Sequence, residues 1–218
     1  MSGARRKTFP LPAAPASLPL TVAAAPSNPS DLLLLAVDLQ PGLLAAIDPT
    51  GVLARDCRFT LAAAVGLGLP VAFTEQVPAK LGATAPALRA AAPSAPVWAK
   101  ETFSALGDET VRGALLAPGG PRHLLLAGIE TPICVYQTAI DALRAELEVT
   151  VLTDCVGARR SADAAAALSA LARLGCHLLP AETVFYSLVQ DSRHPFFRGL
   201  TALVKARAGD PSSAGSSL

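Results

Sequence analysis

The chain has 218 residues, of which 18 are basic, 17 are acidic and 51% are hydrophobic. This length can bury one full hydrophobic core, and the balanced charge argues against the broad basic surface of a nucleic-acid-binding protein. The longest strongly apolar run, Leu32 to Val37, is far shorter than the roughly 20 residues that a membrane span needs, so we expect a water-soluble protein without membrane contact.

Both ends of the chain have the composition of tails. Residues 1–30 are rich in Ala and Pro, contain Arg5, Arg6 and Lys7, and have no acidic residue. We expect a disordered tail there; targeting to mitochondria or another organelle is the alternative, although the prolines disfavour the helix that a presequence needs. Residues 208–218, rich in Gly, Pro and Ser, indicate a second flexible tail, which leaves one domain at 31–207.

Between these tails, short apolar runs alternate with segments of helical periodicity. In chain order we expect a strand at Leu32–Asp38, a helix at Val52–Leu69, a strand at Val71–Thr74, a long loop at 76–96 with a helical turn near Ala87–Ala91, a strand at Val97–Lys100, a helix at Asp108–Leu116, a strand at His123–Ala127, a helix at Pro132–Glu146, a strand at Val149–Thr153, a helix at Ser161–Leu174, a strand at His177–Leu179, and helices at Glu182–Gln190 and Pro195–Ala206. This alternation predicts a single α/β domain with a parallel sheet covered on both faces.

Reactive side chains follow several of these strands. Because crossovers are right-handed, helices on both faces require the strand order to reverse, and ligands bind at the carboxyl ends of strands beside that reversal. Asp38 ends the first strand, Lys100 ends the third, and Cys134 follows the fourth. Pro132 suits the first turn of a helix, which places Cys134 where free N–H groups and the helix dipole stabilise a thiolate and could hold an oxyanion.

A cysteine nucleophile needs a partner that takes its proton, most often a histidine. His123 and His177 begin their strands, at the opposite edge of the sheet, and His194 lies in a late connection. Asp38 therefore remains as the base, and Lys100 would favour the thiolate.

Each member of this set also has a structural interpretation. Asp38 could cap the turn after its strand, Lys100 could be a solvated surface lysine, and Cys134 could be a buried structural thiol. Cys155, which follows Asp154 at the end of the next strand, is the rival nucleophile.

The four cysteines form no CxxC pair and no zinc-like cluster with histidine. Cys57 falls in mid-helix and Cys176 precedes a strand, so both fit a core role. Nothing requires disulfides, which favours a reducing compartment and hence the cytoplasm.

These residues match a known family. The segment LLLAGIETPICVYQTAIDALRAELEVTVLTDCVGAR at 124–159, with VDLQ around Asp38 and KETFS from Lys100, resembles isochorismatase-like cysteine hydrolases, a group that also contains nicotinamidases and N-carbamoylsarcosine amidases. The resemblance runs from about Leu32 to Lys205, and it is nearest to isochorismatase domain-containing hydrolases, whose substrate is generally unassigned.

The resemblance implies a three-layer α/β/α domain whose six-stranded parallel sheet has the order 3-2-1-4-5-6. It implies Asp38, Lys100 and Cys134 as catalytic residues, a cis peptide bond between Ile129 and Glu130, and an oxyanion hole made by the N–H groups of Glu130 and Cys134. It also implies a homo-oligomer, either a dimer or a tetramer.

Two departures from the family's pattern affect the expected chemistry. Nicotinamidases carry an Asp-x-His metal-binding motif where this chain has TEQ at 74–76, so we expect no bound metal, no cofactor and no nicotinamidase activity. Pro132 stands where many relatives have His or Asp, so polar help from that side chain is absent.

The sequence thus predicts a metal-independent cysteine hydrolase that cleaves an amide or related C–N bond of a small molecule through a thioester on Cys134. The alternatives are vinyl-ether hydrolysis of the isochorismate type and a non-catalytic binding or scaffold protein on the same fold. Four further residues are predicted, from their positions in the sequence alone, to line the substrate pocket: Gln40, Gln76, Phe103 and Tyr136.

Overall fold

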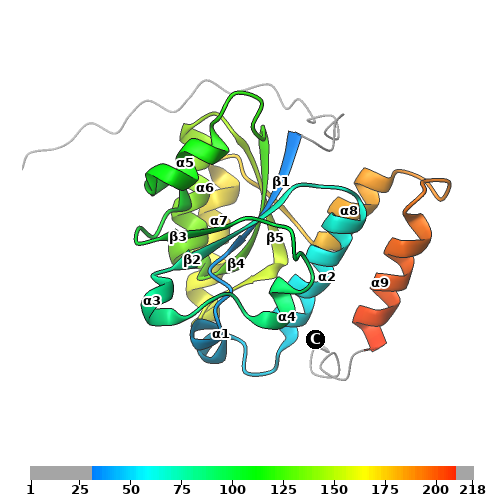
Figure 1. Ribbon diagram of the computed structural model, residues 1–218, viewed down its shortest axis with the longest axis horizontal. Coiled ribbons are helices and arrows are strands. Elements are labelled where there is room, and N and C mark those ends of the chain that lie inside the picture. The colour runs from blue at the N-terminus through cyan, green and yellow to red at the C-terminus, as the bar shows by residue number, and fades with distance from the viewer. Residues whose placement is uncertain (1–30, 210–218) are drawn as a thin grey trace, which may run out of the picture.

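The computed structural model describes residues 31–209, which form one parallel sheet with helices on both faces (Figure 1). The order β3-β2-β1-β4-β5-β6 confirms the predicted topology, with β1 and β4 adjacent at the reversal. The strands are β1 (Leu32–Val37), β2 (Val71–Gln76), β3 (Val97–Lys100), β4 (His123–Ile129), β5 (Glu148–Gly157) and β6 (His177–Leu179).

Helices cover the two faces of the sheet in separate layers. One layer contains α1 (Pro41–Ile47), α2 (Val52–Gly66), α4 (Pro86–Arg89), α8 (Ala181–Val189) and α9 (Phe197–Gly209). The other contains η2 (Ala105–Gly107), α5 (Glu109–Leu115), the turn η3 (Thr131–Val135), α6 (Tyr136–Arg144) and α7 (Ser161–Arg173). The short α3 (Pro78–Leu81) follows β2.

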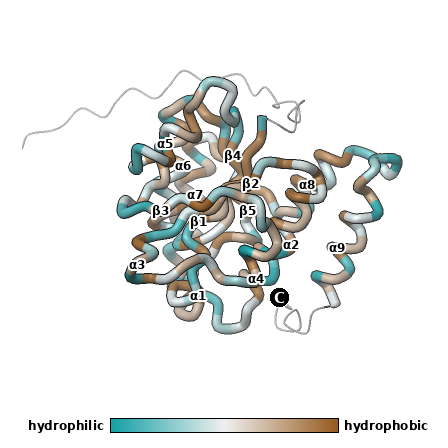
Figure 2. The backbone as a smooth tube through the Cα atoms, in the orientation of Figure 1, coloured by the Kyte–Doolittle hydropathy of each residue, from teal (hydrophilic) through white to brown (hydrophobic). Residues whose placement is uncertain are grey.

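The apolar run of β1 is buried along its whole length because its residues alternate between two cores. Leu32, Leu34 and Ala36 pack in the core beneath α2 and α8, whereas Leu33 and Leu35 pack in the core beneath α5 and α6. Strands covered on both faces are apolar at every position, which is why the sequence shows a continuous run rather than alternation. Figure 2 shows this hydrophobic centre, with more hydrophilic segments at the periphery.

Several boundaries differ from the sequence-based expectation. The sequence did not predict α1 or α3, whereas α4 lies at the helical turn that was expected near Ala87–Ala91; α3 and α4 each begin at a proline. β2 continues two residues past Thr74. β5 continues to Gly157, because its end pairs with Ile129 beyond an irregularity in the β4–β5 register. Asp154 and Cys155 therefore lie inside a strand rather than after it.

At its C-terminal end the described chain continues past the predicted domain limit, because α9 ends at Gly209 rather than at 207. The predicted tails at 1–30 and 210–218 lie outside the described residues. Within 31–209, no helix is long and apolar enough to cross a membrane.

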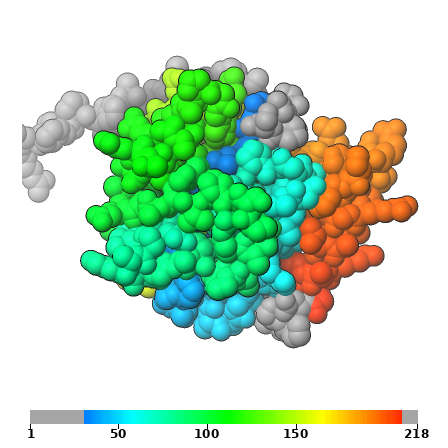
Figure 3. Space-filling view, viewed as in Figure 1, coloured from blue at the N-terminus to red at the C-terminus, as the bar shows by residue number. Residues whose placement is uncertain are grey.

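Arg207 connects α9 to the rest of the domain through three acidic side chains. Its guanidinium donates to Asp56 of α2 at 3.0 Å, to Asp154 of β5 at 2.8 Å and to Glu182 of α8 at 3.4 Å. It also lies over the ring of Phe59, 4.9 Å from the centroid. Figure 3 shows the result: α9, in orange-red, packs along the cyan α2 at one side of the molecule.

Candidate active site

The polar centre of the molecule lies where β1 and β4 end, at the reversal of strand order. Asp38 directly follows β1 and is fully buried. Its backbone N–H donates to the Thr74 carbonyl at 3.0 Å, and the Thr74 hydroxyl donates to its Oδ1 at 2.8 Å. Asp38 has a left-handed backbone with φ of 55°, a region that Asp and Asn enter more readily than most residues.

Lys100, the last residue of β3, reaches across to the second oxygen of Asp38. Its Nζ lies 2.7 Å from Asp38 Oδ2, and neither side chain is exposed to solvent. The same ammonium donates to Gln76 Oε1 at 2.6 Å and lies 3.1 Å and 3.2 Å from the carbonyls of Thr102 and Phe103. These contacts rule out the surface interpretation of Lys100, since a buried ammonium needs such partners.

Cys134 lies in the π-helical turn η3, which begins at Thr131 and leads into α6. Its thiol lies near enough to Asp38 and Lys100 for both charges to act on its pKa, and the backbone N–H of Glu130 also favours the thiolate. Burial raises the pKa of the Cys134 thiol to about 12, with a further increase from Asp38, whereas Lys100 and the Glu130 N–H act in the opposite direction. The thiol is therefore protonated at neutral pH, and it ionises only if a neighbour takes its proton.

The backbone around this turn has two special features. The peptide bond between Ile129 and Glu130 is cis, at the position that the resemblance implied. Gly128 has φ of 121°, and a Cβ at this residue would lie 2.1 Å from the carbonyl oxygen of Val37. No side chain fits there, so glycine allows β4 to end directly beside the residue that precedes Asp38.

The rival nucleophile Cys155 faces the other side of the sheet. Its sulfur is fully buried, 3.0 Å from the Thr60 hydroxyl of α2. Burial and a hydrogen bond with Cys57 hold the pKa of the Cys155 thiol well above its usual range. Cys155 is thus part of the core between β5 and α2.

The histidines do not join the site. His123 and His177 begin β4 and β6, at the opposite edge of the sheet, with ring centroids 6.2 Å apart. His123 Nε2 shares a hydrogen bond with the Thr150 hydroxyl at 2.8 Å. His123 Nδ1 lies 3.2 Å from Glu148 Oε2 without hydrogen-bond geometry. Burial, assisted by His177, lowers the pKa of His123, although Glu148 partly opposes the shift.

This depressed pKa predicts acid sensitivity. The folded state binds the His123 proton less readily than the unfolded chain, whose histidine has a pKa of about 6.5. The stability that neutral His123 contributes is therefore complete above that pH and declines as the pH falls below it, by at most about 1.4 kcal/mol per pH unit. In urea unfolding from pH 8 to pH 5, His123→Gln should lose less stability than wild type; identical pH profiles would contradict this assignment.

The four residues predicted to line a pocket differ in their surroundings. Gln40 is fully buried, and its amide is saturated by backbone groups: Nε2 donates to the carbonyls of Gln76 and Gly82, and Oε1 accepts from the Gln76 N–H. Gln40 is therefore not available to a substrate. Gln76 uses its side chain to hold Lys100, a role that the sequence did not suggest.

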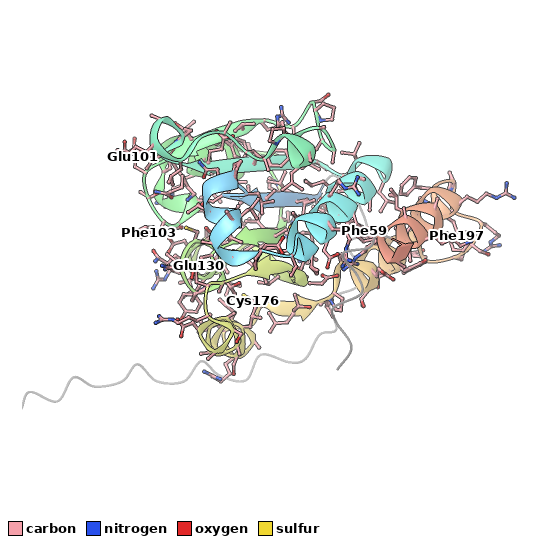
Figure 4. All side chains as sticks on the ribbon, turned by 90° about the horizontal axis from the view of Figure 1, so that it is seen from below. Phe59, Glu101, Phe103, Glu130, Cys176 and Phe197 are labelled. Atoms are coloured by element: carbon pink, nitrogen blue, oxygen red, sulfur yellow. The ribbon has the colours of Figure 1, made fainter. Side chains whose placement is uncertain are left out.

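Phe103 and Tyr136 remain predicted pocket residues. Phe103 is 56% exposed and Tyr136 is half-buried at the start of α6. Figure 4 shows Phe103 with Glu101 and Glu130 on one side of the molecule, whereas Phe59 and Phe197 lie on the other. The exposed residues after β3 and the turn after β4 thus occupy the same side, away from α9.

The buried cluster at this edge of the sheet contains one carboxylate, Asp38, one ammonium, Lys100, and one thiol, Cys134. Thr74 and Gln76 occupy the positions of the Asp-x-His motif, and neither side chain is a strong metal ligand. Across the described chain, no group of three or more His, Cys, Asp or Glu could hold a metal ion.

The strand order and the buried polar cluster at its reversal define a doubly wound α/β protein. The isochorismatase domain matches residues 33–183, and the chain belongs to the isochorismatase family. It is 36% identical to isochorismatase domain-containing protein 2 of Danio rerio over 155 residues. This match covers 71% of this chain and 77% of the relative.

Solved structures show the same fold. The MAR1 ribonuclease from Caenorhabditis elegans superposes with a TM-score of 0.77 at 30% identity, covering 88% of this chain and 97% of that one. YcaC from Pseudomonas aeruginosa, determined with hexane-2,5-diol and covalent acrylamide, gives 0.75 at 26% identity, covering 83% and 93%. YcaC from Escherichia coli, described as an octameric hydrolase of unknown specificity, gives 0.71 at 25% identity, covering 82% and 96%.

Proposed function

We propose that this protein is a metal-independent cysteine hydrolase that cleaves an amide or related C–N bond of a small molecule. The observation that carries the proposal is the position of the Cys134 thiol beside Asp38, a carboxylate held by the buried ammonium of Lys100. A protonated thiol beside a fixed carboxylate is the arrangement that general-base activation of a nucleophile requires. The covalent acrylamide in the Pseudomonas YcaC structure supports a reactive nucleophile in a related protein, since acrylamide alkylates thiols.

The reaction would proceed in two stages. Asp38 takes the proton of Cys134 while the sulfur attacks the carbonyl carbon, and the N–H groups of Glu130 and Cys134 hold the resulting oxyanion. The C–N bond then breaks, and the amine leaves with the proton from Asp38. In the second stage, water gives a proton to Asp38 and attacks the thioester. The acid then leaves, and the proton returns to the sulfur.

Lys100 would keep its charge throughout this cycle. Before proton transfer it balances the Asp38 carboxylate, and afterwards it balances the Cys134 thiolate. The net charge of the three groups is therefore zero in both states, which limits the cost of moving a proton inside a buried site.

A small-molecule substrate fits this edge of the sheet better than the RNA substrate of a ribonuclease. An RNA substrate needs cations that can neutralise phosphates. At this edge of the sheet Lys100 is paired with Asp38, and Arg159 Nε lies 3.0 Å from Glu130 Oε2. These pairings favour a small, uncharged reacting group over a polyanion.

Cys176 is a matched internal control for the reactivity of Cys134. Cys176 and Cys134 have similar exposure, 6% and 7%, and burial alone raises the pKa of the Cys176 thiol to about 11. At pH 7 we expect iodoacetamide to label Cys134 at least about tenfold faster than Cys176, because only Cys134 has a base beside it. Asp38→Asn should abolish the difference. Peptide-level mass spectrometry over time measures both rates in one sample.

Equal labelling of the two cysteines, unchanged by Asp38→Asn, would favour the non-catalytic binding or scaffold alternative. A panel of small amides and isochorismate then separates the two enzymatic alternatives. Amine or ammonia release that disappears in Cys134→Ala supports amide hydrolysis. Pyruvate release that survives in Cys134→Ala supports the vinyl-ether reaction.

We also propose that the protein acts as a homo-oligomer, as predicted from the family resemblance. The octameric state of Escherichia coli YcaC supports this, and the exposed ring of Phe103 offers apolar surface beside the site. Cytoplasmic localisation remains the expectation, although a 31% identical Phytophthora sojae relative is named as a secreted effector.

A further inference from the structure

We propose that Gln76 is a positioning residue whose neutral amide holds Lys100 and leaves Asp38 as the single anionic partner of its ammonium. This inference rests on the proposed function and concerns how the same site keeps its charge balanced. Gln76 stands at the end of β2, directly opposite Lys100 in the parallel β2–β3 ladder. Its Oε1 accepts from Lys100 Nζ at 2.6 Å, the shortest of the four contacts of that ammonium.

The orientation of the Gln76 amide is fixed from its other end. Its Nε2 donates to the carbonyl of Glu101 at 2.8 Å, so Oε1 is the atom that faces Lys100. Its main chain is fixed by Gln40, which accepts from the Gln76 N–H at 2.8 Å and donates to the Gln76 carbonyl at 3.0 Å. Gln40 also donates to the carbonyl of Gly82 and so anchors the end of β2 to the segment after α3.

The choice of an amide at position 76 has an electrostatic consequence. Lys100 has four oxygens within reach, and the Asp38 carboxylate is the only charged one among them. A glutamate at position 76 would have nearly the same shape but would share the ammonium between two carboxylates. The site would then carry one net negative charge, which disfavours a second anion at Cys134.

The other charged groups around the site are peripheral. Glu101 is exposed in the loop after β3, and Glu130 pairs with Arg159 at the turn after β4. Solvent screens the exposed Glu101, and Arg159 balances the charge of Glu130, so both act weakly on Lys100. The amide of Gln76 is therefore the position at which a change of charge should act most strongly on Lys100.

The test compares Gln76→Glu, Gln76→Met and Gln137→Glu by the pH dependence of Cys134 labelling. Gln137 is exposed on α6, three residues after Cys134, so Gln137→Glu makes the same chemical change near the thiol but in solvent. We expect Gln76→Glu to slow labelling roughly tenfold between pH 7 and pH 9, because the added negative charge disfavours the thiolate. Gln76→Met should slow labelling by a smaller factor than Gln76→Glu, because it removes a hydrogen bond from Lys100 without adding a charge. Gln137→Glu should match wild type, as should Cys176 in every variant.

Thermal unfolding checks that each variant is folded, and Gln76→Met remains decisive if Gln76→Glu does not fold. A Gln76→Glu profile that coincides with wild type, or a Gln76→Met rate equal to wild type, overturns this inference while leaving the proposed function intact. Labelling of wild-type Cys134 no faster than Cys176, with no effect of either change at Gln76, overturns both.

Discussion

Replacing Lys100 with methionine should destabilise the fold by about 3–5 kcal/mol and remove the rapid labelling of Cys134. The Asp38 carboxylate and the Lys100 ammonium lie 2.7 Å apart with no solvent exposure, so the variant leaves a buried carboxylate without its counter-charge. The remaining hydrogen bond from Thr74 to Asp38 Oδ1 cannot replace a full positive charge. Urea unfolding at pH 7 measures the loss.

Two companion variants make this result specific. Lys80→Met removes an exposed lysine on α3 and should change stability by less than about 0.5 kcal/mol. Asp38→Asn combined with Lys100→Met removes both charges and should recover much of the stability lost in Lys100→Met alone. A Lys100→Met variant as stable as Lys80→Met would contradict the pairing described here.

Arg207→Met should destabilise the protein by about 3 kcal/mol or more, through an effect at the opposite side of the molecule from the site. The change removes the shared partner of Asp56, Asp154 and Glu182, and it also removes the cation above Phe59. Asp56 keeps its contact with Arg55 at 2.8 Å, whereas Asp154 keeps its acceptance of the Ala181 N–H. Hydrogen exchange should show the loss first in α9, since Leu200 is its only fully buried side chain among those described.

Lys205→Met provides the matched control, because Lys205 is exposed on the same helix. It should leave both the unfolding midpoint and the exchange of α9 close to wild type. Equal behaviour of Arg207→Met and Lys205→Met would show that α9 is held by its apolar contacts alone. Cys134 labelling should be unaffected in either variant under folding conditions.

The convergence of Asp38, Lys100 and Cys134 followed from the sequence because topology alone brings strand ends to one edge. Each strand was visible as an apolar run, and right-handed crossovers limited how those runs could be ordered. The same reasoning placed His123 and His177 at the far edge, where they are found. The edge of the sheet at which these residues meet was therefore predictable from local pattern, whereas the strand order came from the family resemblance.

Features that depend on side-chain distances were not predictable in this way. Gln40 and Gln76 look alike in sequence, yet one is saturated by backbone groups and the other holds Lys100. That difference depends on the register that places Gln76 opposite Lys100. Likewise, the apolar run that predicted β5 ends before Asp154 and Cys155. The strand continues through these residues because its end pairs with Ile129 of β4, which the local sequence does not reveal.

The backbone conformation of Asp38 limits which residues can replace it, independently of the role of its carboxylate. A φ of 55° is readily adopted by Asn and Gly but is strained for Ala, Ser or Glu. Among replacements of Asp38, Asn and Gly should therefore avoid the backbone penalty, although both leave the Lys100 ammonium without its partner. Asp38→Ala would therefore combine a backbone penalty with the loss of the Asp38–Lys100 ion pair, whereas Asp38→Asn would lose mainly the ion pair.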